Sequence, residues 1–288
     1  MIFRLCTQTE KLWGIIKNKM QHARKKIGLA LGGGGAKGLA HIGILKVFEQ
    51  NNIPIDYIAG TSIGAMVGGY YAASKSARFV EEVALNSDMK QFASLMFELT
   101  RDGGLVRGDK ILAYLEKSLD GMDFSELKIP FAAAATELNC GDVYYFEKEG
   151  DVARAIRASI SYPPVFAPLK IKNKLYVDGG LSCQVPVDKV KQMGADIVVA
   201  VDLEGDYVFH KKVFNQAAAI GNTYRVFRAS IKVLVKKLGE YNTQKADLVI
   251  TPLVGKYRTW ADFDKARQLI KIGEESAKKA LKDIKKLL

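Results

Sequence analysis

Short apolar runs alternate along the chain with longer segments in which apolar residues recur every three or four positions. Continuous apolar runs bounded by glycine, proline or aspartate are typical of strands buried on both faces, whereas a period near 3.6 is typical of helices. The runs that predict strands are residues 27–31, 55–59, 131–138, 175–177, 195–203 and 248–250. The segments that predict helices are residues 39–48, 63–74, 110–119, 151–159, 185–194, 215–238 and the chain from 262 onward.

The order of these elements predicts the fold class. Strands that alternate with helices favour a largely parallel sheet with helices on both faces, so we expect an α/β protein with three layers, α/β/α. The run at 143–146 follows a Cys140-Gly141-Asp142 turn and is expected to form a hairpin with 131–138. The helical pattern from 78 to 119 is broken by a loop at 102–104. Because no repeat or long linker divides the chain, we expect one domain over 27–288 and an appendage over 1–26.

Composition narrows the class of protein. Of the 288 residues 48% are apolar and 26% charged, the usual balance for a globular protein. The three cysteines are far apart, which argues against a disulfide framework or a thiolate zinc site. No apolar run approaches the ~20 residues of a bilayer span, and the N-terminus lacks the apolar core of a secretory signal. We therefore expect a cytoplasmic protein.

The net charge of +12 is concentrated in particular segments. Residues 1–26 carry seven basic residues against the single acid Glu10, and their apolar residues recur at roughly helical spacing. This pattern predicts an amphipathic helix on an anionic membrane surface, with peripheral attachment at the inner face; a solvated extension packed on its own domain is the alternative. A second stretch without acids, 207–237, faces either phosphates or water. Nucleic acid is not expected as a partner.

The first candidate site is the glycine-rich loop at 32–38, between a predicted strand and a predicted helix. Unpaired amides at such a helix start favour an anion. A Walker A loop is excluded because Ala36 precedes Lys37 and a glycine follows it. A dinucleotide fingerprint matches formally at Gly33, Gly35 and Gly38, but the next strand does not end in the acid that this site needs. The third possible function of this loop is an oxyanion hole.

The second candidate site, Gly60-Thr61-Ser62-Ile63-Gly64, has the G-x-S-x-G pattern of a nucleophile elbow. A serine at this sharp turn from strand to helix needs glycines two residues away, where strand and helix come close. Both glycine-rich loops follow consecutive strands, and parallel strands end at one edge of the sheet. Amide donors and a serine nucleophile are therefore expected to meet there; packing turns without chemistry are the alternative.

A serine nucleophile needs a base, and the histidines offer poor candidates. His22 lies in the basic lead, His41 is expected to be a packed core residue, and His210 follows Ser62 in the order of α/β-hydrolases but sits in a charged segment. Asp178 is the better candidate, because it ends an apolar strand before Gly179-Gly180 and should be exposed at the sheet edge. A turn-capping aspartate is its alternative role.

Taken together, these motifs resemble those of bacterial patatin-like phospholipases. Residues 33–38 resemble the oxyanion loop of the family, 60–64 its nucleophile elbow, and Asp178-Gly179 its catalytic aspartate and the following glycine. The block 158–168 is also similar, although Pro163-Pro164 stands where the family more often has proline-glycine. The likeness spans about residues 27–204, and no similarity is found in 1–26.

The resemblance implies hydrolysis of acyl esters in phospholipids or lysophospholipids without a metal or other cofactor. Ser62 would attack the ester carbonyl while Asp178 takes its proton, and the amides of Gly33, Gly34 and Gly35 would hold the oxyanion. Lys37 would contact a substrate phosphate or lie at the surface. Because an aspartate of ordinary pKa is a weak base, the site must exclude water and raise that pKa. A nucleotide-dependent enzyme and a non-catalytic binding module remain as alternatives.

Overall fold

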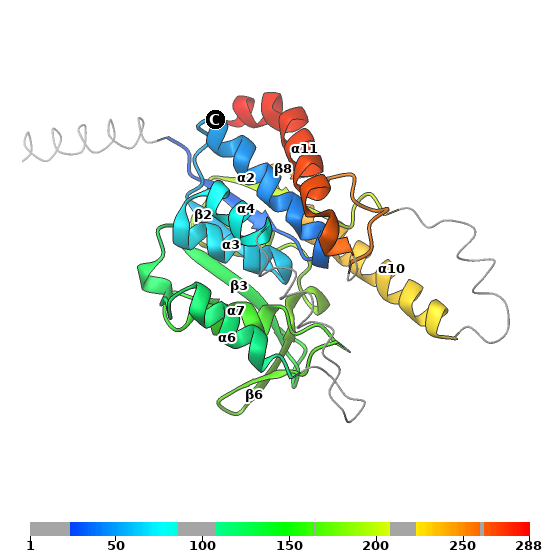
Figure 1. The fold of residues 1–288 in the computed structure, drawn as a ribbon. Helices are drawn as coiled ribbons and strands as arrows, with labels where there is room; N and C mark the ends of the chain where they lie inside the picture. Colours follow the sequence, from blue (N-terminus) through cyan, green and yellow to red (C-terminus); the bar gives the residue numbers. More distant parts are fainter. Residues whose placement is uncertain (1–23, 86–106, 164, 208–222, 260–261) are drawn as a thin grey trace, which may run out of the picture.

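A computed structural model describes residues 24–85, 107–163, 165–207, 223–259 and 262–288 (Figure 1). Within these ranges one sheet of eight strands runs through the molecule in the order β5-β6-β3-β2-β1-β7-β8, and β4 pairs with β3. The strands are β1 (Ile27–Leu31), β2 (Tyr57–Thr61), β3 (Phe131–Glu137), β4 (Val143–Glu147), β5 (Leu169–Ile171), β6 (Lys174–Asp178), β7 (Ile197–Val201) and β8 (Leu248–Ile250).

Helices cover both faces of this sheet, which confirms the predicted three-layer α/β/α class. The α-helices are α2 (Ala40–Gln50), α3 (Ile63–Ser74), α4 (Ala77–Leu85), α6 (Asp109–Ser118), α7 (Val152–Ser159), α8 (Val187–Gln192), α10 (Thr223–Thr243) and α11 (Ala266–Leu287). Short 3-10 helices are η1 (Gly35–Leu39), η2 (Phe124–Glu126), η3 (Gly179–Leu181) and η4 (Asp262–Lys265). Among the described helices, none combines the length and apolarity needed to cross a bilayer.

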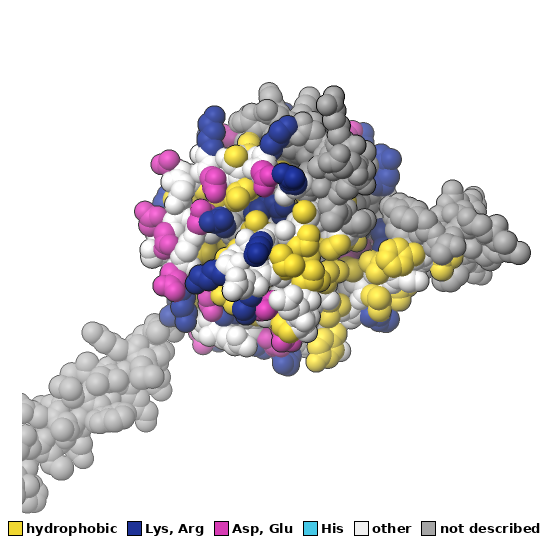
Figure 2. All heavy atoms as spheres, turned by 90° about the horizontal axis from the view of Figure 1, so that it is seen from below, with side chains coloured by type: hydrophobic (Ala, Val, Ile, Leu, Met, Phe, Trp, Pro, Cys, Tyr) yellow, Lys and Arg dark blue, Asp and Glu magenta, His cyan; other side chains and the backbone are white. Residues whose placement is uncertain are grey.

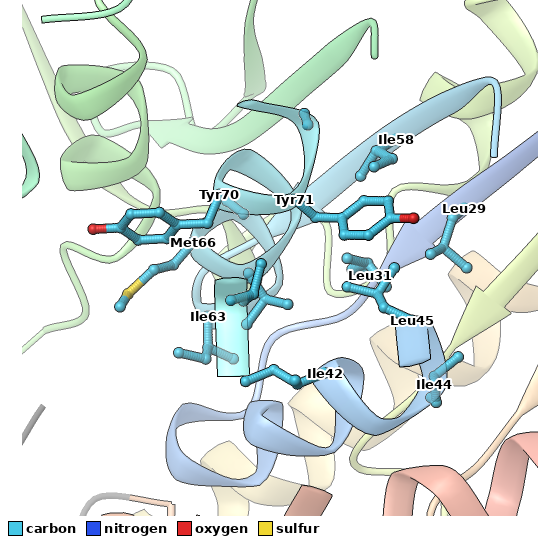
Figure 3. Close-up of a cluster of buried hydrophobic side chains, with 14 of the residues drawn as sticks. Leu29, Leu31, Ile42, Ile44, Leu45, Ile58, Ile63, Met66, Tyr70 and Tyr71 are labelled. Carbon is cyan, nitrogen blue, oxygen red and sulfur yellow. The ribbon is translucent and has the colours of Figure 1, made fainter. Parts of the chain in front are cut away.

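The larger core lies between the sheet and the layer that contains α2, α3 and α11. Alternate residues of β1 supply it, with Leu29 and Leu31 fully buried against Ile42 and Leu45 of α2. Figure 3 shows these side chains converging between the strands and the helices. Because successive strand residues point to opposite faces, Ala30 belongs instead to the smaller core under α8. The apolar run of a doubly covered strand therefore serves both layers.

The predicted sheet is confirmed as mainly parallel. β1 pairs in parallel with β2 and β7, while β2 pairs in parallel with β3 and β7 with β8. The predicted hairpin also forms, since β3 and β4 pair in antiparallel register. β5 has no counterpart in the prediction, because its sequence Leu169-Lys170-Ile171 is not a continuous apolar run. The predicted break at 102–104 and the first residues of the helix at 215–238 lie outside the described residues.

β6 is antiparallel to β3, and this decides where the strand ends meet. β2 pairs with β3 as far as Thr61, opposite Ala134, and β6 pairs with β3 from Asp178, opposite Ala135. β4 occupies the other edge of β3 over both stretches. Therefore β2 and β6 lie on the same edge of β3 and run toward each other. Thr61, the last residue of β2, and Asp178, the last residue of β6, are therefore neighbours along the same edge of β3.

The start of the described chain contacts the domain. Arg24 forms an ion pair of 2.6 Å with Asp56, and the amide of Lys26 donates a hydrogen bond of 2.7 Å to Asp196. The remainder of the predicted amphipathic segment, residues 1–23, lies outside the described residues. Its helix and its role as an appendage stay predictions.

Candidate active site

Ser62 lies at the turn between β2 and α3, as the elbow pattern predicts. Its backbone has φ 55° and ψ −124°, a conformation that is unfavourable for a residue with a side chain. The flanking glycines permit this turn. A Cβ at Gly60 would lie 2.4 Å from the carbonyl oxygen of Gly64, and a Cβ at Gly64 would lie 2.2 Å from that of Leu31. Only glycine fits where the strand, the helix and the first loop approach so closely.

Asp178 meets Ser62 across the gap between the two strand ends. The Ser62 hydroxyl donates a hydrogen bond of 2.6 Å from Oγ to Oδ2 of Asp178, and the amide of Gly180 donates one of 2.8 Å to Oδ1. Ser62 is 7% exposed and Asp178 only 2%. The expectation that Asp178 is exposed at the sheet edge is therefore wrong. The head-to-head arrangement of β2 and β6 encloses the carboxylate instead.

Burial gives this carboxylate an unusual proton affinity. Removal from water raises the pKa of Asp178 to about 6, because the charged form loses its hydration. The hydrogen bonds from Ser62 and Gly180 favour the charged form and oppose this shift, but burial has the larger effect. The carboxylate is consequently a stronger base than an aspartate in water, while it stays ionised at neutral pH.

The glycine-rich loop lies beside the serine, but its three expected donors are not equivalent. The amide of Gly33 donates a hydrogen bond of 3.1 Å to the carbonyl oxygen of Gln184, so it is not free to hold an oxyanion, contrary to the expectation. Gly33 instead allows close approach, since a Cβ there would lie 3.4 Å from Cβ of Ser62. Within the described residues the amides of Gly34 and Gly35 have no acceptor. Gly34 is the N-cap of η1 and Gly35 is its first residue, where a helix start leaves amides unpaired.

Two further residues, Ser159 and Gln184, hold the site together. The amide of Ser62 donates to Oγ of Ser159 at 2.8 Å, and that hydroxyl donates to the carbonyl oxygen of Ala134 at 2.6 Å. The side-chain amide of Gln184 donates to the carbonyl oxygen of Gly33 at 2.8 Å. The sequence offered no signal for either role, because the partners lie 97 and 151 residues away along the chain.

Lys37 forms a buried ion pair. Its side chain is fully buried and its ammonium lies 2.8 Å from the carboxylate of Glu204, so neither the expected phosphate contact nor the surface position holds. The ring of Tyr207 lies 5.7 Å from the same ammonium. Because a buried charge needs a partner, the pair with Glu204 explains why a lysine is tolerated at this position. The ion pair attaches the glycine-rich loop to the segment after β7.

His41 is a packed core histidine, as predicted. It is fully buried, and its Nε2 lies 2.9 Å from the carbonyl oxygen of Gly32. Burial lowers the pKa of His41 to about 4, so the ring is neutral at physiological pH and donates this hydrogen bond. It supports the glycine-rich loop without touching Ser62. The other two histidines, His22 and His210, lie outside the described residues.

A protein family model and several known proteins match this sequence. A family model described as patatin-like phospholipase matches residues 29–191. An uncharacterized NTE family protein of Mycobacterium tuberculosis is 35% identical over 180 residues, which cover 62% of this chain and 49% of that protein. Lysophospholipase nte1 of Neurospora crassa is 33% identical over 187 residues, covering 62% of this chain and 12% of the relative. The chain thus spans at most about half the length of these relatives.

A solved structure supports the fold. The crystal structure of VipD from Legionella pneumophila aligns with 91% of this chain and 67% of its own, at a TM-score of 0.57 and 14% sequence identity. At this identity the likeness concerns the fold alone. It agrees with the three-layer arrangement built from the strands and helices above.

Proposed function

The chain belongs to the patatin-like phospholipase family, and from this premise we propose that it is a serine acyl hydrolase that cleaves fatty-acyl esters of phospholipids or lysophospholipids. The observation that carries the proposal is the hydrogen bond of 2.6 Å from Ser62 Oγ to Asp178 Oδ2, in a site nearly closed to water. A nucleophile and a base in direct contact form the minimal unit of acyl transfer. No histidine of the described chain lies between them.

The proposed reaction has two halves. In the first, Oγ of Ser62 attacks the ester carbonyl while Asp178 takes the hydroxyl proton. The amides of Gly34 and Gly35 hold the developing oxyanion, and the alcohol leaves with the proton from Asp178. In the second, water attacks the acyl-serine ester as Asp178 accepts its proton. The fatty acid then leaves, and the proton returns to Ser62.

The raised pKa of Asp178 suits this role. A base whose pKa lies near the working pH combines ionisation with useful proton affinity. Asp178, with a pKa of about 6, meets both conditions, whereas an aspartate in water would not. The burial that raises the pKa is thus part of the proposed mechanism.

A pH profile tests this assignment. Since only the ionised Asp178 accepts the proton, kcat/KM on a soluble ester should rise with pH and reach half of its plateau near pH 6. The measurement is the initial rate of hydrolysis of a short-chain p-nitrophenyl ester from pH 4.5 to 8. A profile that is flat across this range would show that a group of ordinary carboxylate pKa, or none, limits the reaction.

Covalent labelling tests the proposed nucleophile. A fluorophosphonate probe should label the wild-type chain at Ser62 and leave Ser62→Ala unlabelled. A panel of phospholipids and lysophospholipids, assayed with both proteins, should show fatty acid release by the wild type alone. Absence of labelling together with calorimetric binding of ATP or a dinucleotide would instead favour the nucleotide-dependent alternative.

We also propose that the enzyme works at the surface of a membrane. The substrate class is found there, and the basic segment 1–26 suits an anionic surface. Binding of this segment to lipid, its separation from the domain at 27–288, and cytoplasmic location stay predictions.

A further inference from the structure

α10 exposes a row of large apolar side chains. Figure 1 shows this helix running outward from the body of the molecule, with its N-terminal half farthest away. Phe227, Leu234 and Tyr241 are 61%, 64% and 70% exposed, although large apolar side chains are more stable when buried. We use the name docking stripe for the exposed apolar residues Val226, Phe227, Val233, Leu234 and Tyr241.

The docking stripe lies along one side of the helix. At 100° per residue its five members fall within an arc of about 120°. Exposed Ser230 and Lys237 lie in the same arc. On the opposite side Gly239 and Thr243 are buried against the domain. In Figure 2 hydrophobic side chains gather over the part of the molecule from which α10 projects. Large exposed apolar side chains that recur on one side of a helix, with only Ser230 and Lys237 between them, mark an interaction site rather than scattered surface residues.

The charge of α10 indicates the chemistry of its partner. The helix contains five basic residues and a single acid, Glu240. Lys232 lies 4.3 Å from the ring centre of Tyr207, and Lys236 donates to the carbonyl oxygen of Tyr207 at 2.9 Å. These two cations therefore belong to the side packed on the domain, whereas exposed Lys237 lies within the arc of the stripe. An exposed apolar stripe on a helix of net positive charge is the pattern of a helix that lies in the interface of an anionic bilayer.

α10 is connected to the active site by direct contacts. Oδ1 of Asn242 accepts hydrogen bonds from the amides of Gln184 and Val185 at 2.8 and 3.3 Å. Gln184 in turn exchanges two hydrogen bonds with Gly33, which lies against Ser62. Leu181, three residues after Asp178, is also 45% exposed. The helix that carries the docking stripe is thus attached to the loop that borders the nucleophile.

We propose that the docking stripe of α10 inserts into the surface of a bilayer that contains anionic phospholipid and so holds the active site against its substrate. The choice of a lipid surface over a protein partner rests on the proposed function, because the acyl esters are in the bilayer. Charge favours the same choice: a second copy of a chain with net charge +12 would be repelled, whereas an anionic surface attracts it.

Substitution of two exposed residues tests the proposal in the chain of 288 residues. The double variant Phe227→Ser/Leu234→Ser should bind sedimented vesicles of phosphatidylcholine and phosphatidylglycerol at least about tenfold more weakly than the wild type, since two large side chains no longer enter the bilayer. A matched control, Phe79→Ser/Leu138→Ser, removes side chains that are 40% and 49% exposed elsewhere. It should bind as the wild type does. Thermal unfolding of all three proteins should agree.

Hydrolysis separates docking from catalysis. The Phe227→Ser/Leu234→Ser variant should lose activity on vesicle lipid by a similar factor but keep the wild-type rate on a soluble short-chain ester. If the wild type binds vesicles through α10 yet hydrolyses neither substrate, the proposed function fails and the docking surface stands. Unchanged vesicle binding by the variant overturns the docking proposal. So does a dimeric wild type that becomes monomeric in the variant without loss of vesicle binding, because the stripe is then a contact between copies.

Discussion

Replacing Asp178 with asparagine is expected to abolish ester hydrolysis and, at neutral pH, to make the fold more stable. Asparagine keeps the shape of the side chain, so its carbonyl oxygen still accepts from Gly180 and its NH2 group donates to Oγ of Ser62. The variant cannot take the serine proton. We expect kcat to fall by at least about 10³-fold, as for the loss of a base that acts directly on the nucleophile.

The gain in stability follows from the direction of the pKa shift. Burial raises the pKa of Asp178 from 3.8 to about 6 in the folded protein, so the native state binds the proton more tightly than the unfolded chain. The stability contributed by the protonated carboxyl is present below pH 4 and is lost as the pH rises to about 6. At pH 7 the ionised group costs the native state about 3 kcal/mol, and neutral asparagine avoids that cost.

Urea unfolding at pH 4 and pH 7 measures this difference. The free energy of unfolding of Asp178→Asn should exceed that of the wild type by up to about 3 kcal/mol at pH 7, with much less difference at pH 4. Ser62→Ala should lose comparable activity, and the double variant should be no slower than either single one, because the two side chains act as a unit. His210→Ala should keep wild-type activity. Retained turnover in Asp178→Asn would falsify the proposed dyad.

Replacing Gly64 with alanine is expected to damage both the fold and the site. Its Cβ would lie 2.2 Å from the carbonyl oxygen of Leu31 and 2.7 Å from that of Gly32, and both are backbone atoms that no rotamer change can move. The helix α3 would have to shift away from the end of β1. We expect a loss of at least about 3 kcal/mol in the free energy of unfolding, at the upper end for overpacking.

The same shift would separate the glycine-rich loop from Ser62, so kcat/KM should fall by about 10²-fold or more in the Gly64→Ala protein that remains folded. Gly121→Ala is the matched control. At Gly121 the backbone has φ 65° with no atom within 4 Å of an added Cβ, so the variant should lose about 1 kcal/mol through strain and keep its activity. Equal loss of activity in the two variants would show that instability alone is responsible.

The catalytic candidates could be found from the sequence because their signals are local. The elbow around Ser62 needs glycines two residues away on either side, and Asp178 is followed at once by Gly179 and Gly180. These glycines stand next to the residues that they serve, so the motifs can be seen in consecutive residues even where the close contact, as between Gly64 and Leu31, joins distant segments. The strands also leave local signals. Apolar runs identified six of the eight strands, although not their exact boundaries, and the turn at 140–142 identified β4 as the hairpin partner of β3. Only β5, in which Lys170 interrupts the apolar residues, gave no pattern.

The environment of those residues depends on contacts that are distant in sequence. Asp178 was expected at an exposed edge, but β6 runs antiparallel to β3 and meets β2 head to head, which buries the carboxylate. Lys37 was expected near a phosphate, but Glu204, 167 residues away, neutralises it in the interior. Gly33 was expected to be a free donor, but its amide is bonded to Gln184.

The sequence by itself determined the alternation of strands and helices, the nucleophile and the carboxylate, because apolar period and glycine spacing act over a few residues. Only the tertiary structure decided which segments enclose Asp178, how far its pKa rises, to about 6, and which amides of the glycine-rich loop are free. The physical reason is that burial and hydrogen bonding depend on which distant segments pack together. Which segments pack together follows from the direction and register of the strands. Local periodicity predicts neither the direction nor the register.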